Sequence, residues 1–281
     1  MNVGIIGLGY VGTALKEGFK HIHHIETYDL RKDLSTCQTI DDLLSKTDII
    51  FICVPTPMNE DGSSNLNVVN KVIDEISNSK YLKKQILIIK STVPPGTTEL
   101  LNSKHKNLEI IFNPEFLTEA NFVEDFKNQN RIILGGARPA TTILKQFYIS
   151  IFPNATIIKT GSSHAEMVKY LANTFLATKV SFANEMKMIC DKLDIDYDKV
   201  VEYASYDERL GKSHWSVPGP DGNLGFGGSC FPKDINALIH KASELNLDTK
   251  VINAAWETNL KVRPERDWEL LEGRAVTKKD D

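Results

Sequence analysis

The sequence predicts an α/β protein in which a doubly wound sheet domain is followed by an all-helical domain. Up to about Gly161, short β-branched apolar runs alternate with helical stretches, a pattern typical of a parallel sheet covered on both faces. From Ser162 to Leu210 the chain has neither glycine nor proline and shows helical periodicity. We therefore expect one domain over residues 1–161 and a second, helical domain over residues 162–281.

Seven apolar runs are the expected strands, separated by helical stretches and by loops of glycine, proline, asparagine or threonine. In chain order they are NVGIIG, IETYD, DIIFICV, QILIIKS, LEIIF, RIILGG and ATIIKTG. In the second half, Ser163 and Glu166 have the spacing of a capping box and predict a helix N-terminus. A second helical stretch is expected from Asp234 to about Leu271, and the closing VTKKDD is expected to be a solvated tail.

Length and composition exclude several classes of protein. The 281 residues, 41% hydrophobic and 25% charged, indicate a soluble globular chain. A net charge of -4 shows no basic bias toward nucleic acid or a membrane surface, and the start MNVGIIGLGYVG is neither a signal peptide nor an anchor. Four cysteines without C-x-x-C spacing predict no metal site and no disulfide framework, which favours a cytoplasmic location.

A glycine-rich loop follows the first expected strand and leads into a helix. Gly7, Gly9 and Gly12 form a G-x-G-x-x-G motif, which permits a tight turn and lets a pyrophosphate approach the helix N-terminus. Asp29 ends the next strand, where a carboxylate binds an adenosine ribose and repels a 2′-phosphate. The first domain is therefore expected to be a Rossmann domain that binds NAD. Its expected cofactor-binding residues here are Gly7, Gly9, Tyr10, Val11, Gly12 and Asp29.

Three further loops are expected at the same sheet edge as this glycine loop. They are VPTP at 54–57, STVPPGTT at 91–98 and NPEFLTEA at 113–120. Because the carboxyl ends of parallel strands share one edge, Thr92, Glu115 and Glu119 are candidates to face a nicotinamide and its substrate. Exposed loop glutamates are more often solvated than catalytic, and spacing alone does not separate Glu115 from Glu119.

Two features of the helical half suggest chemistry. Lys169 and Asn173 lie four residues apart on one face of an apolar helix, where a lysine either reaches solvent or lines a polar cavity. The stretch GFGGSCFPKD, residues 225–234, places Cys230 three residues before Lys233, which would stabilise a thiolate. Taken alone, a nucleophilic thiol and a cysteine packed in an ordinary turn fit this stretch equally well.

Together these segments resemble the UDP-glucose/GDP-mannose dehydrogenase family, whose members oxidise the C6 alcohol of a nucleotide sugar to a carboxylate. The matching segments are GLGYVG, VPTP, STVPPGTT, NPEFLTEA, EMVKYLANTFLATKVSFANE, YDERLG and GFGGSCFPKD, in the family's order. The resemblance implies two hydride transfers to NAD, separated by attack of a cysteine thiolate on the aldehyde and followed by thioester hydrolysis. UDP-glucose is the substrate that it favours.

The resemblance also assigns residue roles. Cys230 matches the nucleophile, Lys169 and Asn173 match the pair that steadies the oxyanion, and Glu115 matches the general base. Asp234 and Thr92 match residues that position the water, and Arg209 matches an arginine that reaches the substrate across a dimer. The cofactor contacts it adds are Val54, Pro55, Thr56, Thr92 and Glu119. The substrate contacts are Phe116, Leu117, Glu119, Lys169, Asn173, Arg209, Gly225, Phe226, Gly227, Gly228 and Lys233.

Two departures and several alternatives accompany this resemblance. The segment between Asp29 and Asp48 is shorter than usual for the family, and the family's third, C-terminal nucleotide-binding domain is expected to be absent from the 281 residues. A homodimer formed through the helical domain is implied. The alternatives are a GDP-mannose or UDP-N-acetyl-aminosugar dehydrogenase, a two-electron β-hydroxyacid-type dehydrogenase, and a non-catalytic nucleotide-sugar or NAD binding protein.

Overall fold

The computed structural model describes residues 1–278, which divide into two compact units. The first unit comprises residues 1–56 and 66–169. The second comprises residues 57–65 and the chain from Tyr170 onward. Residues 57–65 therefore join the helical unit although they lie within the sheet half of the sequence. Within residues 1–278, no helix combines the length and the apolar composition needed to cross a bilayer.

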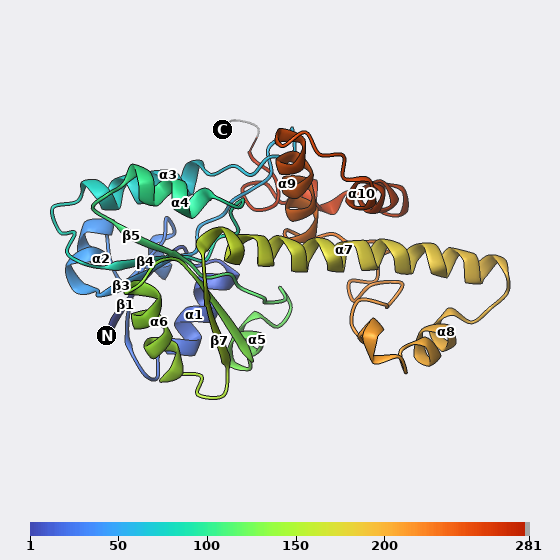
Figure 1. Cartoon of the computed structure of the whole chain (residues 1–281), viewed down its shortest axis with the longest axis horizontal. Coiled ribbons are helices and arrows are strands. Elements are labelled where there is room, and N and C mark those ends of the chain that lie inside the picture. The colour runs from blue at the N-terminus through green and yellow to red at the C-terminus, as the bar shows by residue number, and fades with distance from the viewer. Residues whose placement is uncertain (279–281) are drawn as a thin grey trace. The chain divides into compact units, whose positions relative to one another are not determined.

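The first unit is built on one sheet, and the predicted α/β fold class is confirmed (Figure 1). All seven apolar runs form strands, which are ordered β2-β1-β3-β4-β5-β6-β7 across the sheet. Their bounds are β1 (Asn2–Ile6), β2 (His24–Tyr28), β3 (Ile49–Ile52), β4 (Ile86–Ile89), β5 (Glu109–Phe112), β6 (Arg131–Gly135) and β7 (Thr156–Thr160). The strand order reverses direction on either side of β1, so the glycine loop after β1 lies at a topological switch point.

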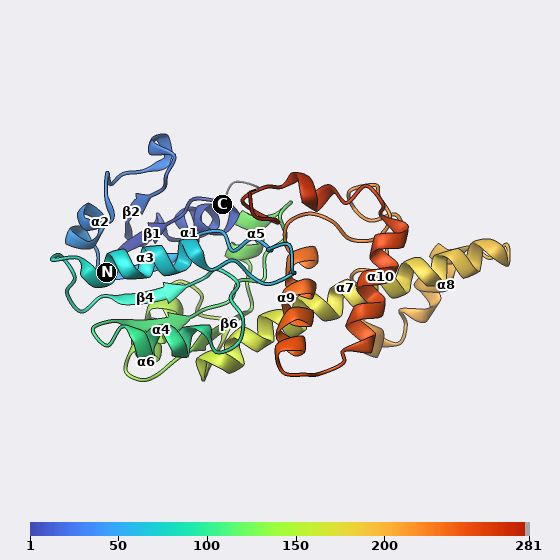
Figure 2. The same ribbon diagram turned by 90° about the horizontal axis from the view of Figure 1, so that it is seen from above.

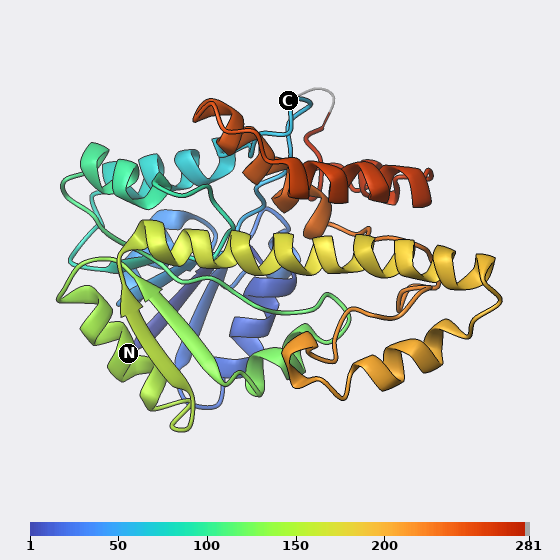
Figure 3. The same ribbon diagram turned by 45° about the vertical axis from the view of Figure 1, so that its right-hand side comes forward.

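One strand pair departs from the predicted parallel sheet. β5 and β6 are antiparallel, with Phe112 opposite Gly135, whereas β6 and β7 run parallel and lie side by side in Figure 3. A parallel return usually carries a helix that packs across the sheet. Residues 113–130, which connect β5 to β6, form the 113–121 loop and only the short helix α5 (Phe122–Lys127), and β6 runs antiparallel to β5. As a result, Arg131 at the start of β6 lies at the edge where β5 ends.

Helices cover both faces of this sheet because strand side chains alternate between two apolar clusters. Ile50 and Ile52 pack on one face, and Ile49 and Phe51 on the other. The first face is covered by α2 (Ile40–Lys46), α3 (Asn67–Asn78) and α4 (Thr97–Lys104). The second is covered by α1 (Tyr10–Phe19), α5 and α6 (Ala140–Ile149). The short helix η1 (Lys32–Leu34) follows β2.

The second unit consists mainly of helices. α7 (Ser162–Lys192) begins in the first unit and contributes its residues from Tyr170 onward, and the chain then reverses into α8 (Tyr197–Ala204) (Figures 1 and 3). α9 (Phe231–Glu244) and α10 (Lys250–Val262) cross α7 in Figure 2. Their shared core contains Ala177, Phe226, Ile235 and Ala255. Two short helices, η2 (Glu208–Leu210) and η3 (Asp267–Leu270), complete the unit.

Three predictions about the helical half need correction. The stretch expected from Asp234 to Leu271 is two helices and η3, because Asn246 adopts a left-handed φ of 57° and ends α9. Glu166 does not complete a capping box within α7, since its carboxylate accepts hydrogen bonds from the backbone of Gly96 and Thr98. The tail from Val276 is not simply solvated, because Val276 and Met58 form a β-bridge. Residues 279–281 of that tail lie outside the described residues.

Candidate active site

The glycine loop has the geometry that a dinucleotide pyrophosphate needs. A Cβ on Gly12 would lie 1.9 Å from the carbonyl oxygen of Gly7, so only glycine allows α1 to pack this closely on β1. A Cβ on Gly9 would meet no described atom within 4 Å, which leaves the backbone open to a ligand at the start of α1. Tyr10 is partly exposed and Val11 is half-buried at the first turn of that helix.

Asp29 is held in place at the end of β2. Its Oδ2 accepts a hydrogen bond of 2.6 Å from the backbone nitrogen of Leu8, and Arg31 Nε lies 3.1 Å from Oδ1. Burial alone would raise the pKa of Asp29, but these hydrogen bonds and the charge of Arg31 hold it below its usual range. An ionised carboxylate beside the glycine loop fits a ribose, so the residues present fit NAD.

The loops after β3 and β4 are tied together at the same sheet edge. The hydroxyl of Thr56 donates to the carbonyl oxygen of Thr92 at 2.8 Å, and the hydroxyl of Ser91 donates to the carbonyl oxygen of Val54 at 2.6 Å. Thr56, Thr92 and Val54 are buried, whereas Pro55 is exposed. This arrangement confirms that the loops share one edge of the sheet.

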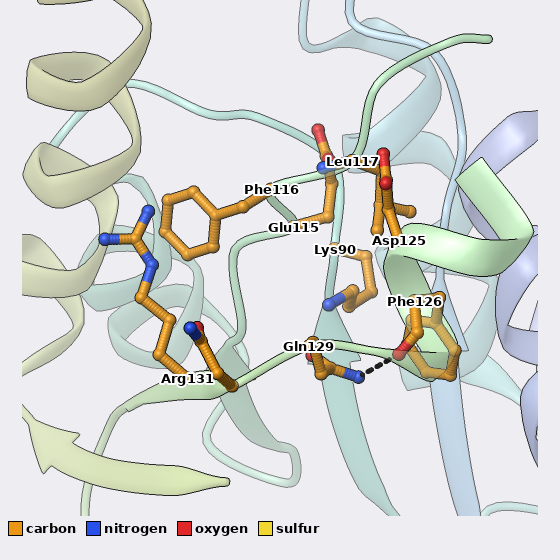
Figure 4. Close-up of a pocket in the computed structure, with 9 residues that line it drawn as sticks. Lys90, Glu115, Phe116, Leu117, Asp125, Phe126, Gln129 and Arg131 are labelled. Carbon is orange, nitrogen blue, oxygen red and sulfur yellow. Dashed lines mark hydrogen bonds between the residues drawn. The ribbon is translucent and has the colours of Figure 1, made fainter. Parts of the chain in front are cut away.

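A pocket of about 510 Å³ opens at this edge within the first unit (Figure 4). Glu115 lies on the loop after β5, and its Oε1 pairs with Lys169 Nζ of α7 at 2.8 Å. Its Oε2 accepts a hydrogen bond from the backbone nitrogen of Leu117 at 2.7 Å. Phe116 packs under the guanidinium of Arg131, whose Cζ lies 4.0 Å from the ring centroid. Figure 4 shows both side chains at one side of the pocket.

The carboxylate of Glu115 is ionised by its surroundings. Burial tends to raise its pKa, but the charge and hydrogen bond of Lys169 and the backbone of Leu117 outweigh burial and lower it. Lys169 is only 3% exposed, so the alternative in which this lysine reaches solvent is wrong. Glu119 lies half-buried further along the same loop. The pairing of Glu115 with Lys169 is a distinction that sequence spacing did not provide.

In the second unit, Cys230 occupies the N-cap position directly before α9. Asp234, in the first turn of that helix, is 1% exposed, and its backbone nitrogen donates to the carbonyl oxygen of Cys230 at 3.0 Å. Its carboxylate accepts from Asn173 Nδ2 at 2.6 Å and pairs with Lys233 Nζ at 2.5 Å. The structure therefore brings Asn173, Lys233 and Asp234 together in one buried cluster beside the start of the cysteine's helix.

The glycine-rich loop before Cys230 is fixed by a side chain of α10. Asn259 is fully buried; its Oδ1 accepts from the backbone nitrogen of Phe226 at 2.7 Å, and its Nδ2 donates to the carbonyl oxygen of Phe226 at 2.9 Å. Gly225 has a φ of 65°, and a Cβ there would lie 2.4 Å from Asn259 Oδ1. The side-chain amide of Asn259 thus bonds both the backbone N–H and the backbone carbonyl of Phe226, as a neighbouring strand would.

A buried arginine holds the other half of the same loop. The Arg263 guanidinium pairs with Asp221 at 2.6 Å and with Asp267 at 2.6 Å, and Asp267 Oδ2 accepts from the backbone nitrogen of Gly228 at 3.0 Å. A Cβ on Gly227 would lie 2.3 Å from Asp267 Oδ1. The close approach of these side chains therefore requires glycine.

Arg209, in η2, lies on the surface of the second unit. Its side chain is 88% exposed, and its guanidinium pairs with the carboxylate of Asp207 two residues earlier. This position leaves the guanidinium accessible to a molecule outside the chain. Among the described residues, no three His, Cys, Asp or Glu side chains gather as a metal site.

Sequence reasoning missed three residues that organise these clusters, namely Lys90, Asn259 and Arg263. Lys90 had a detectable signal, because it is a lysine at the end of the apolar strand run ILIIKS. Asn259 and Arg263 lie four residues apart near the end of α10, which is also the spacing of an ordinary solvated helix face. Their roles depend on contacts with residues more than thirty positions away.

Two family models match the chain in sequence order. The NAD binding domain of the UDP-glucose/GDP-mannose dehydrogenase family matches residues 20–153, and the central domain of that family matches residues 163–261. The two matches cover most of the first unit and most of the second.

Curated relatives and solved structures agree with these matches. UDP-glucose 6-dehydrogenase TuaD of Bacillus subtilis is 32% identical over 93% of this chain and 63% of its own length. UDP-glucose 6-dehydrogenase of Rickettsia bellii is 34% identical over 94% of this chain and 68% of its own length. The structure of a UDP-glucose dehydrogenase from Pyrobaculum islandicum superposes with a TM-score of 0.85 at 30% identity, covering 96% of this chain and 70% of that one. The chain thus spans less than two thirds of the length of TuaD.

Proposed function

Because the chain belongs to the UDP-glucose/GDP-mannose dehydrogenase family, we propose that it oxidises the C6 alcohol of a nucleotide sugar to a carboxylate. The expected reaction converts UDP-glucose to UDP-glucuronate. NAD, bound at the glycine loop, supplies the chemistry of accepting two hydrides in succession. The observation that carries the proposal is Cys230 at the start of α9, next to the buried cluster of Asn173, Lys233 and Asp234.

The proposed reaction proceeds in four steps. The first hydride leaves C6 and the hydroxyl proton is lost, which gives an aldehyde. The Cys230 thiolate then forms a C–S bond to that carbon, and the resulting thiohemiacetal loses the second hydride to become a thioester. Water attacks the thioester carbonyl, the C–S bond breaks, and the products are the carboxylate and the regenerated thiol.

The setting of the four thiols supports Cys230 as the nucleophile. Burial raises the pKa of Cys37 to about 11 and that of Cys53 to about 12, so both stay protonated near neutral pH. Cys190 is buried in an apolar cluster with Ala183 and Val217. Cys230 is half-buried at the N-terminus of a 14-residue helix, where the helix dipole favours a negative charge.

The remaining proposed roles are those that the family resemblance implies, and the charges of Lys169 and Glu115 are compatible with them. Lys169 and Asn173 supply the ammonium and amide donors that stabilise an oxyanion, and the ionised Glu115 is suited to accept the proton of the attacking water. Thr92 and Asp234 position that water, and Glu119 contacts the cofactor or the substrate. The clamped loop of residues 225–228 offers its backbone to the sugar, with Phe116, Leu117 and Lys233 as further contacts.

We propose that two copies associate through the exposed apolar side chains of α7. These side chains, 48–64% exposed, are Leu171, Phe175, Phe182 and Ile189, together with Leu193 directly after the helix. They recur at intervals of four and seven residues, which places them along one side of the helix. A second copy would bury them and would bring an accessible Arg209 from the partner to the bound nucleotide sugar.

The cytoplasm is the proposed location of the protein. None of the four cysteines forms a disulfide within residues 1–278, which fits a reducing compartment.

The test is the stoichiometry of turnover with UDP-glucose. We expect two NADH per UDP-glucuronate formed, and we expect Cys230→Ser to abolish formation of the carboxylate. Cys190→Ser, which removes a thiol outside the proposed chemistry, should retain the stoichiometry. One NADH per substrate would favour the two-electron alternative, and NAD binding without turnover on any nucleotide sugar would favour a binding protein. The same assay with GDP-mannose and UDP-N-acetyl-mannosamine identifies the substrate.

A further inference from the structure

A second buried lysine lies in the same pocket as Glu115. Lys90, directly after β4, is 3% exposed, and its Nζ donates hydrogen bonds to Asn113 Oδ1 at 3.1 Å and to the carbonyl oxygen of Pro114 at 3.2 Å. Burying an ammonium group is costly unless it is well paired. Figure 4 shows its side chain extending beneath Glu115. The sequence-based roles leave this lysine unused.

The acceptor of Lys90 is the centre of a buried network. Asn113 is 1% exposed, and its Oδ1 also accepts a hydrogen bond of 2.6 Å from the hydroxyl of Tyr148 on α6. Its Nδ2 donates to the carbonyl oxygen of Ile133 in β6 at 2.8 Å. The side chain of Asn113 is thereby bonded to Lys90 directly after β4, to β6 and to α6, and it cannot rotate without breaking several buried hydrogen bonds.

Glu115 follows this network by two residues. Lys90 holds the side chain of Asn113 and the carbonyl of Pro114, so it restrains the backbone from which the Glu115 side chain projects. The carboxylate of Glu115 in turn uses one oxygen for Lys169 and the other for Leu117. The backbone before the proposed general base and its carboxylate are therefore both held by hydrogen bonds.

We propose that Lys90 is a positioning residue for Glu115, because it clamps the Asn113–Pro114 turn and supplies a second positive charge beside the carboxylate. This inference rests on the proposed role of Glu115 as the base. It adds the residue directly after β4 to the catalytic apparatus, and this residue acts through the loop after β5.

The charged groups around Lys90 determine how the loss of its charge changes the pKa of Glu115. The groups that interact with it electrostatically are Cys53, Glu115 and Lys169, and Tyr148 shares its acceptor. Burial lowers the pKa of Lys90 to about 8, so it is cationic at neutral pH and lowers the pKa of Glu115. Loss of the Lys90 charge should therefore move the ionisation of Glu115 to higher pH.

The experiment compares wild type with Lys90→Met, which keeps a long stem but removes the charge. Tyr148→Phe is the matched control, because it removes a hydrogen bond to the same Asn113 oxygen without changing the charge. The pH dependence of kcat with UDP-glucose and NAD is measured, and the ¹³C-labelled Glu115 carboxyl is titrated by NMR, with its signal assigned through Glu115→Gln. The NMR titration does not depend on turnover.

We expect Lys90→Met to move the acid limb of kcat and the Glu115 titration upward together by about one pH unit. Tyr148→Phe should leave both in place. An unchanged Glu115 titration in Lys90→Met, or an equal shift in Tyr148→Phe, overturns the inference. If wild type does not turn over any nucleotide sugar but its Glu115 titration responds to Lys90→Met, the proposed function fails while the coupling of the two residues stands.

A measurement on the unmodified protein covers the case in which Lys90→Met does not fold. The wild-type Glu115 carboxyl signal should show a second, smaller inflection in the alkaline range, where Lys90 loses its proton at a pKa that burial lowers from the usual lysine value. A Glu115 signal that is flat through that range overturns the inference.

Discussion

Replacing Arg263 by methionine tests whether the loop of residues 225–228 is held by charge. The guanidinium is 4% exposed and pairs with Asp221 and Asp267, which are 47% and 38% exposed. Breaking a fully buried ion pair costs about 3–5 kcal/mol. Because both carboxylates would regain water here, we expect a loss of about 2 kcal/mol, or a fall in Tm of about 4–8 °C.

The loss should reach the proposed substrate site through Asp267, which accepts the hydrogen bond of the Gly228 backbone. We therefore expect the KM for the nucleotide sugar to rise in Arg263→Met while the KM for NAD stays the same. The assays are thermal unfolding by circular dichroism and steady-state kinetics with each substrate varied in turn. Both the Tm and the KM report on the ion pairs of Arg263 with Asp221 and Asp267.

Arg266→Met is the matched control for this prediction. Arg266 lies three residues away, is 48% exposed, and pairs with the exposed Glu269 at 3.4 Å. Its replacement should change stability by less than about 0.5 kcal/mol. If Arg263→Met behaves like Arg266→Met in both unfolding and KM, the buried ion pairs do not hold the loop and the reasoning is refuted.

Three further predictions follow from other contacts. Gly9→Ala should leave Tm unchanged, because its Cβ meets no described atom within 4 Å, yet it should weaken NAD binding in calorimetry; an unchanged Kd would contradict the placement of the pyrophosphate. The double variant Phe175→Glu/Phe182→Glu should convert a dimer to a monomer in sedimentation velocity, whereas the control Lys187→Glu should remain dimeric. A double variant that remains dimeric would place the interface elsewhere. Burial lowers the pKa of His23, which stacks on Phe147 at 4.7 Å, so its contribution to stability is present above pH ~6.5 and is lost as pH falls toward its folded pKa. His23→Phe should therefore reduce the fall in Tm between pH 8 and pH 5, and an exposed His21→Phe control should not.

The sequence predicted the strands and the glycine loop because both depend on short-range patterns. Apolar runs such as ILII and EIIF become strands wherever they are covered on both faces. Gly7, Gly9 and Gly12 lie in one loop and are recognised by their spacing. The helical spacing of Lys169 and Asn173 was likewise readable from a few residues. The roles of the proposed catalytic side chains, in contrast, are implied by the family resemblance and not by spacing alone.

Interactions between distant segments were outside the reach of the sequence. The direction of β6, the partner of Glu166 and the joining of residues 57–65 to the helical unit all depend on which segments meet in space. The sequence by itself determined the fold class, the strands and the residue types available for chemistry. Only the tertiary structure decided that Glu115 pairs with Lys169, that Lys90 holds Asn113, and that Arg263 holds the loop before Cys230. The physical reason is that burial and ion pairing are properties of the folded surroundings, whereas periodicity and spacing belong to the chain itself.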